Sequence, residues 1–149
     1  MKTITLILLQ FICSITLNAQ CDFLWISTPA AMDTFTCTSV NNINIIVSNN
    51  TDPIVDFSNL ANLESVTTNL RIANAFDNPV EITDLNFENL TTVGSLSISS
   101  GDIAIDTLYF PKLASVGSIS IAVDSLNLLR FKSLKSLTNN FSLKSNSRS

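Results

Sequence analysis

Few side chains in this sequence could do chemistry, and their types exclude most kinds of catalytic site. The chain has no histidine, so it lacks the commonest general base and the commonest metal ligand. It also lacks a Gly-x-Ser-x-Gly nucleophile elbow and a phosphate-binding loop. One carboxylate pair, Asp84 and Asp106, occupies matching places in neighbouring repeats and could form the acid pair of a polysaccharide hydrolase or lyase. The long loops that build a sugar cleft are missing, so we expect no enzymatic activity, no cofactor and no metal site.

Residues 1–19 have the layout of a secretory signal peptide. A lone Lys2 precedes an apolar run, and small or polar residues follow toward Ala19. A membrane anchor is the alternative, but Gln10, Ser14 and Thr16 interrupt a stretch that is already short for spanning a bilayer. We therefore predict cleavage on export. The mature chain would have no transmembrane segment and would be secreted, extracellular or bound at the cell surface.

Export would leave two cysteines in the chain, Cys21 and Cys37. An even pair in an exported protein predicts a disulfide, and two free thiols are the alternative. The bond would close a loop of about 16 residues and contribute on the order of 3 kcal/mol. Residues 20–37 hold the only tryptophan, Trp25, and we interpret them as an N-terminal cap, which the disulfide would tether to the rest of the domain. An exposed aromatic patch for a ligand is the alternative interpretation.

One apolar phrase occurs five times between residues 37 and 143. A large apolar residue is followed three positions later by Val or Leu, and three or four positions after that by an apolar-x-apolar pair. The phrase begins at Cys37, Leu63, Leu90, Leu113 and Leu134. These starts lie 21 to 27 residues apart, the range in which one repeat makes one coil of a solenoid. The repeat therefore predicts an architecture and names no ligand.

The apolar-x-apolar pairs alternate with period two, which indicates short, half-buried strands. Stacking in register would give an all-β parallel solenoid of about five short coils over residues 38–145, followed by a polar tail at 146–149. Three phenylalanines at equivalent places, Phe87, Phe110 and Phe131, should then stack inside. Gly94 and Gly117 also share a place, which we interpret as a corner with positive φ. The outward residues of the strands form the candidate binding face: Asn44, Arg71, Ser97, Ser120 and Ser142.

The repeat resembles the receptor L-domain family. The likeness is carried by stretches such as Cys37-Thr-Ser-Val40-Asn-Asn-Ile43-Asn-Ile45 and Phe87-Glu-Asn-Leu90-Thr-Thr-Val93-Gly-Ser-Leu96-Ser-Ile98. That family includes domains of insulin-receptor-like and epidermal-growth-factor-receptor-like proteins, nematode secreted proteins and fungal cell-wall proteins. The resemblance implies a right-handed, exported β-solenoid that acts by binding or as a surface module. The cysteine-rich module and kinase of the full receptors are not in this sequence, so receptor signalling does not carry over.

Charge is spread unevenly along the chain. Residues 22–124 hold all twelve acidic residues against two cations, whereas residues 130–148 hold five cations. Such an axial dipole could align chains end to end, and a solvated basic tail is the alternative. Three sequons, at Asn49, Asn89 and Asn140, could carry glycans in a eukaryotic source.

These features together predict a non-enzymatic binding module that presents a rigid solenoid face to a protein, peptide or glycan. The alternative is a structural or cell-wall protein that acts by assembly, with possible end-to-end self-association. No nucleic-acid partner is expected.

Overall fold

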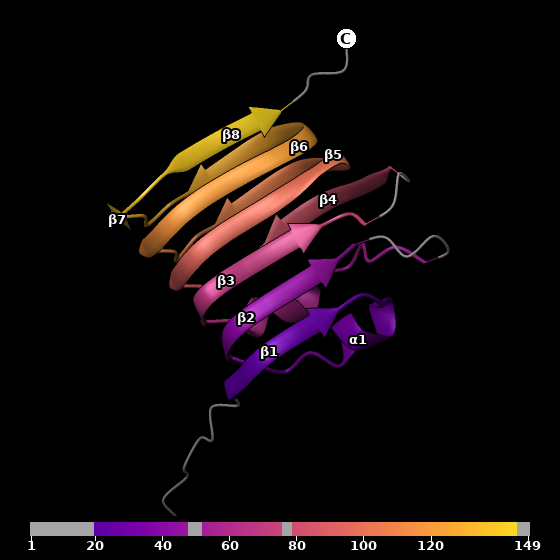
Figure 1. The fold of residues 1–149 in the computed structure, drawn as a ribbon, viewed down its shortest axis with the longest axis horizontal. Coiled ribbons are helices and arrows are strands. Elements are labelled where there is room, and N and C mark those ends of the chain that lie inside the picture. The colour runs from indigo at the N-terminus through magenta and orange to yellow at the C-terminus, as the bar shows by residue number, and fades with distance from the viewer. Residues whose placement is uncertain (1–19, 48–51, 76–78, 146–149) are drawn as a thin grey trace, which may run out of the picture.

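The computed structural model describes residues 20–47, 52–75 and 79–145, and its strands pair side by side in one parallel sheet that winds into a solenoid (Figure 1). The predicted β-solenoid of about five short coils is confirmed. The elements in chain order are β1 (Gln20–Ile26), α1 (Pro29–Asp33), β2 (Ser39–Ile46), η1 (Ser58–Asn62), β3 (Ser65–Ala73), β4 (Val80–Asn86), β5 (Thr92–Phe110), β6 (Ser115–Phe131), β7 (Ser136–Leu137) and β8 (Phe141–Ser145).

The sheet has two walls because β5 and β6 are long enough to bend around the coil (Figure 1). The front wall, as we call it, consists of β1, β2, β3, β8 and the first halves of β5 and β6. The back wall consists of β4 and the second halves of β5 and β6, paired in register. Both walls send apolar side chains inward, so the core is a column that runs along the stack.

Register in the front wall follows the repeated phrase. Ile43, Leu70 and Leu96 are neighbours in one row, and the row continues through Ile119 to Phe141. The four residues of this row before Phe141 are at most 1% exposed. Identical positions of successive coils therefore bury one another, which is why a repeated sequence folds into a repeated shape.

The predicted ladder of phenylalanines is confirmed on the back side of the column. The ring centroids of Phe87 and Phe110 are 5.0 Å apart with an interplanar angle of 3°, and those of Phe110 and Phe131 are 5.1 Å apart at 10°. Both centroid distances fall within the range in which aromatic pairs gain energy beyond burial alone. The ladder joins three successive coils.

The expectation that Gly94 and Gly117 mark corners of positive φ is wrong. Neither residue lies in the left-handed region, and the reason for glycine is steric. A Cβ added to Gly94 would lie 2.3 Å from the carbonyl oxygen of Thr67, and one added to Gly117 would lie 2.1 Å from that of Gly94. Two backbones approach too closely here for any side chain.

The N-terminal end is closed by a tethered cap, as predicted. Cys21 and Cys37 form a disulfide, and β1 pairs with β2 as a further parallel strand. Thr28 caps α1, where its Oγ1 accepts a hydrogen bond from the backbone N–H of Ala31 at 3.2 Å. Met32 and Phe35 are 1% and 5% exposed, so the helix and the turn after it cover the first coil.

The last described coil has no such cover. Phe141 and Leu143 of β8 are in register with the buried Ile119 and Ile121, yet they are 49% and 44% exposed. Leu137 of β7 is also exposed. The apolar column therefore opens to solvent at the β8 end.

Three of the sequence predictions lie outside the described residues: the signal peptide at 1–19, the sequon at Asn49 and the tail at 146–149. Within the ranges that the structure describes, no helix has the length and apolar character needed to cross a membrane.

Candidate binding face

The five outward residues predicted from the repeat lie in one row across the front wall. Strand pairing aligns Asn44 with Arg71, Arg71 with Ser97, Ser97 with Ser120, and Ser120 with Ser142. A second outward row runs beside it, through Asn42, Asn69, Ser95 and Ser118. The front wall thus presents two parallel lines of small or polar side chains.

Two aromatic residues of β1 extend these rows. Phe23 pairs with Asn42, and Trp25 pairs with Asn44. Their side chains are 63% and 59% exposed, so both rings lie on the outside of the wall. The cap interpretation holds for the segment as a whole but is wrong for Trp25. A strand that sends Leu24 and Ile26 toward the core must send its alternate residues outward.

Hydrogen bonds between neighbouring coils order the polar side chains next to the aromatic pair. The Asn69 Nδ2 donates to Asn42 Oδ1 at 3.1 Å, and the Arg71 Nη1 donates to Asn44 Oδ1 at 3.0 Å. Both bonds use the side-chain oxygen of a β2 asparagine as the acceptor. Further along, the Ser118 Oγ donates to Ser95 Oγ at 2.9 Å.

A shallow hollow of about 360 Å³ lies over these side chains. Its lining comes from four strands of the front wall and consists of Phe23, Asn42, Ile43, Asn44, Asn69, Arg71 and Ser97. Arg71 is the one charged residue of that lining. We call Phe23, Trp25, Asn42, Asn44, Asn69 and Arg71 the aromatic–amide patch.

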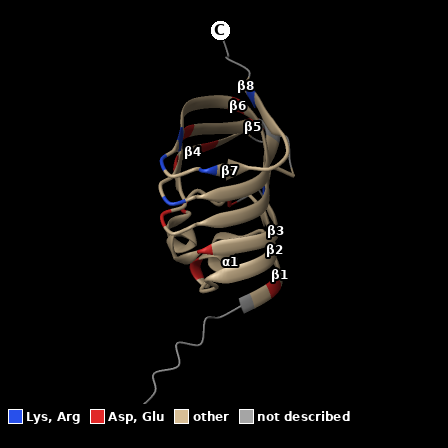
Figure 2. Ribbon diagram, turned by 90° about the vertical axis from the view of Figure 1, so that its left-hand side faces the viewer, with Lys and Arg blue, Asp and Glu red and all other residues tan. Residues whose placement is uncertain are grey.

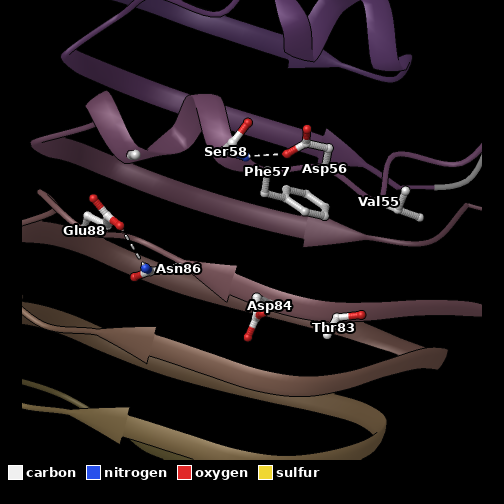
Figure 3. A pocket seen from close by; sticks show the side chains of 9 residues that line it. Val55, Asp56, Phe57, Ser58, Thr83, Asp84, Asn86 and Glu88 are labelled. Atoms are coloured by element: carbon white, nitrogen blue, oxygen red, sulfur yellow. Dashed lines mark hydrogen bonds between the residues drawn. The ribbon is translucent and has the colours of Figure 1, made fainter.

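A second hollow, of about 490 Å³, lies between η1 and β4 (Figure 3). Figure 3 shows the carboxylates of Asp56, Asp84 and Glu88 around it, with Val55 and Thr83 at one end. The pKa of Asp56 is held below 3.8 chiefly because its Oδ1 accepts a hydrogen bond from the Ser58 backbone N–H at 2.8 Å. The described residues contain no group of three or more His, Cys, Asp or Glu that could hold a metal ion.

The two acids of the possible carboxylate pair, Asp84 and Asp106, are not aligned by the strand register. The register aligns Asp84 with Thr107, so Asp106 lies one residue out of step. Asp84 lines the hollow of Figure 3, whereas Asp106 lines a different hollow with Thr83 and accepts a hydrogen bond from Asn127.

The two described sequons differ in their surroundings. Asn89 is partly buried, where its Nδ2 donates to the carbonyl oxygen of Ala61 at 2.7 Å and its Oδ1 accepts from Lys112 Nζ at 2.6 Å. Asn140 is exposed just before β8. A glycan therefore has freer access to Asn140 than to Asn89.

The predicted charge asymmetry is visible on the folded chain (Figure 2). Acidic residues occupy the β1–α1 end and one flank, and cations gather toward the β7–β8 end. Among these cations, the Arg130 guanidinium lies 5.6 Å from the ring centre of Tyr109, within cation–π range.

Comparison of the chain with protein-family models, with curated proteins and with solved structures finds no match.

Proposed function

We propose that this chain is a non-enzymatic binding module, exported to the extracellular space or the cell surface, that presents its front wall to a ligand. The observation that carries the proposal is the exposure of Phe23 and Trp25, at 63% and 59%, in register with ordered amide and guanidinium groups. Single exposed apolar side chains are ordinary on protein surfaces. Two neighbouring aromatics beside oriented donors are what a recognition surface requires.

The rigidity of the patch supports this function. β1 is hydrogen-bonded to β2 along its length, and the Cys21–Cys37 disulfide fixes it to the first coil. A ligand would therefore meet side chains that are already in place and would lose little free energy to ordering them. The resemblance to the receptor L-domain family supports binding rather than catalysis. The disulfide and the signal-like residues 1–19 support export.

A capture experiment with the mature chain, residues 20–149, tests the proposal. The chain and a Phe23→Ala/Trp25→Ala double variant would be immobilised and exposed to extracellular fluid or cell surfaces of the source. We expect a partner that the double variant fails to retain. The matched control is Phe141→Ala, which removes an exposed aromatic from the other end of the solenoid. Equal capture by the double variant and the parent chain would refute the proposal.

A second candidate function is assembly, favoured by the open coil at the β8 end. Phe141, Leu143 and Leu137 are exposed apolar residues there. Lys144 lies in β8 beside them, whereas Asp22 and Asp33 lie in β1 and α1 at the opposite end of the solenoid. Head-to-tail contact between copies would cover the exposed apolar residues and pair the charges, and such an interface extends into filaments unless it closes.

Sedimentation of the mature chain at increasing concentration and salt distinguishes assembly from simple binding. Assembly predicts larger species at low salt that dissociate as salt is added, because exposed charges are screened. Phe141→Lys should abolish these species. Ser142→Lys should not, because Ser142 is the next residue of β8 and lies on the outer face of the front wall. A chain that stays monomeric at every concentration would contradict assembly.

A further inference from the structure

We infer that the aromatic–amide patch is a saccharide-binding site, in which the ring of Trp25 or Phe23 stacks on the face of a pyranose. The inference rests on the proposed binding function and names its ligand class. A pyranose has an apolar face of C–H bonds and a rim of hydroxyl groups. A site for it therefore needs an aromatic plane next to side chains that both donate and accept hydrogen bonds.

The patch supplies both parts at neighbouring positions. Trp25 lies beside Asn44 in the sheet, and Asn44 lies beside Arg71. An amide and a guanidinium at adjacent rungs, about 4.8 Å apart, can bond to two hydroxyls of one sugar. Because Asn44 Oδ1 already accepts from Arg71 at 3.0 Å, the two groups hold each other in orientation, and the outward donors are ready for a ligand.

The shape of the site fits a small, flat ligand. The hollow of about 360 Å³ is at the lower end of the range of about 300–1,000 Å³ for small-molecule sites. The rows beyond the patch are serines, so the surface next to the hollow is flat and polar. A short saccharide or the end of a glycan chain can occupy such a surface without entering the core.

A peptide fits the same surface less well. Peptide recognition relies on backbone pairing at a free strand edge or on deep apolar pockets for side chains. The strands that line the hollow beside β1 are paired on both edges, so their backbone groups are used within the sheet. The free edge in this part of the described sheet belongs to β1 and lies on the side away from β2. Over the hollow itself, side-chain amides and aromatic planes are the recognition elements, and these favour a sugar.

The single tryptophan makes the test direct, because all tryptophan fluorescence of the chain comes from Trp25. The mature chain would be titrated with chitotriose, cellotriose, mannotriose and sialyllactose, and its emission recorded. We expect a saturable change in emission with at least one of these sugars. Phe23→Ala and Asn44→Ala, which keep the tryptophan, should weaken that binding roughly tenfold or more.

Four further variants test where the sugar binds and whether it is charged. Trp25→Ala should lose binding on a glycan array, and Trp25→Phe, which keeps an aromatic plane, should retain part of it. Phe141→Ala, at the far end of the solenoid, should bind like the parent chain. Arg71→Gln distinguishes ligand charge, because an acidic sugar would lose its ion pair and a neutral sugar would keep its hydrogen bonds.

Two results would overturn the inference. One is a folded chain whose emission none of the four sugars changes and which binds nothing on the array. The other is sugar binding that Trp25→Ala and Phe23→Ala both leave intact, since the site would then lie elsewhere. If capture of a protein partner still depended on Phe23 and Trp25, the binding function would stand and the saccharide inference alone would fail.

Discussion

Gly94 and Gly117 lie where the backbones of neighbouring coils approach closely. Their backbones lie so close that no side chain fits between the coils, and this explains glycine at both positions without any unusual φ. Sequence comparison of the repeats identified the two equivalent positions but assigned them the wrong cause, because a shared glycine signals either backbone freedom or close approach.

Gly117→Ala should therefore destabilise the fold by about 1–3 kcal/mol, the usual cost of forcing atoms into a packed site. The new Cβ would lie 2.1 Å from the Gly94 carbonyl oxygen, which is backbone and can move only with its strand. Urea denaturation followed by circular dichroism measures the loss. Ser120→Ala is the matched control, since this outward residue of the same strand should change stability by less than about 0.5 kcal/mol. Equal midpoints for the two variants would contradict the steric explanation.

Asp56 offers a pH-dependent test at the same scale. Hydrogen bonding to Ser58 lowers the pKa of the Asp56 carboxyl in the folded chain below 3.8. The ionised Asp56 therefore stabilises the fold at pH values above the pKa of Asp56 in the unfolded chain, and this stabilisation is lost as the pH falls through its pKa in the folded chain. NMR titration of the Asp56 carboxyl carbon should give a midpoint below 3.8. In the urea-unfolded chain, the midpoint should return to the ordinary aspartate value. Identical midpoints in the two states would show that the hydrogen bond is absent.

Strand β1 both caps the core and displays the aromatic pair. Its inward residue Ile26 is buried, while Phe23 and Trp25 lie outside, so one short strand serves the core and the candidate site. The Cys21–Cys37 disulfide holds it against β2. The geometry of the patch should then depend on that bond.

Replacing both cysteines by alanine should lower stability by on the order of 3 kcal/mol, as expected for a loop of this length. Ligand capture through Phe23 and Trp25 should weaken as well, because β1 is then free to separate from the sheet. Amide hydrogen exchange measures that separation, with faster exchange expected at β1 and little change at β5. The parent chain with its disulfide reduced should behave like the variant in which both cysteines are replaced by alanine. Unchanged exchange at β1 would show that strand pairing alone holds it.

Much of the front wall was predictable from sequence because each inward residue packs on its counterpart in the next coil. Ile43, Leu70 and Leu96 therefore had to share a residue type, and their common spacing fixed both the register and the outward row. β1 was harder to predict because Cys21-x-x-Leu24-x-Ile26 matches only the second part of the repeated phrase, without its first apolar residue. The residues around it do not follow the repeat. Its alternation was the available signal for exposed Phe23 and Trp25.

The back wall was less predictable because two residues separate the buried Ile82 from the buried Leu85, whereas one residue separates the two apolar residues of each front-wall pair. Ile82 and Leu85 align with Ile105 and Leu108, and the acid is the second residue between them in β4 but the first in β5. A one-residue difference moves a side chain to a different neighbour. Sequence alone could not choose between the two alignments, which is why Asp84 and Asp106 were expected to match.

The whole molecule is a stack in which each coil packs mainly against the coils next to it. The long-range strand pairs join one coil to its neighbour, and β5 with β6 makes the largest of these contacts. Stability should therefore be close to a sum over coils and their interfaces. A globular core would not have this property.

Deleting residues 97–119 removes one complete coil and joins Leu96 to Ser120, which preserves the alternation because Ser97 and Ser120 are equivalent. The shortened chain should still fold, with a β-type circular dichroism spectrum and a lower denaturation midpoint. Deleting residues 97–118 instead places Ile119 directly after Leu96 and reverses the faces of the strand, so that chain should not fold. Failure of both chains, or folding of both, would contradict the additive description.

The two ends of the described stack differ, since a covalent bond closes the first coil and the last described coil has no cover. Under a stretching force applied between the chain ends, we expect the protein to peel from β8 inward. Each step would release one coil's length of polypeptide, and extension would stop short of the residues enclosed by Cys21 and Cys37. Such a molecule would yield gradually under tension while the strand that carries Trp25 stayed attached to the last remaining coils.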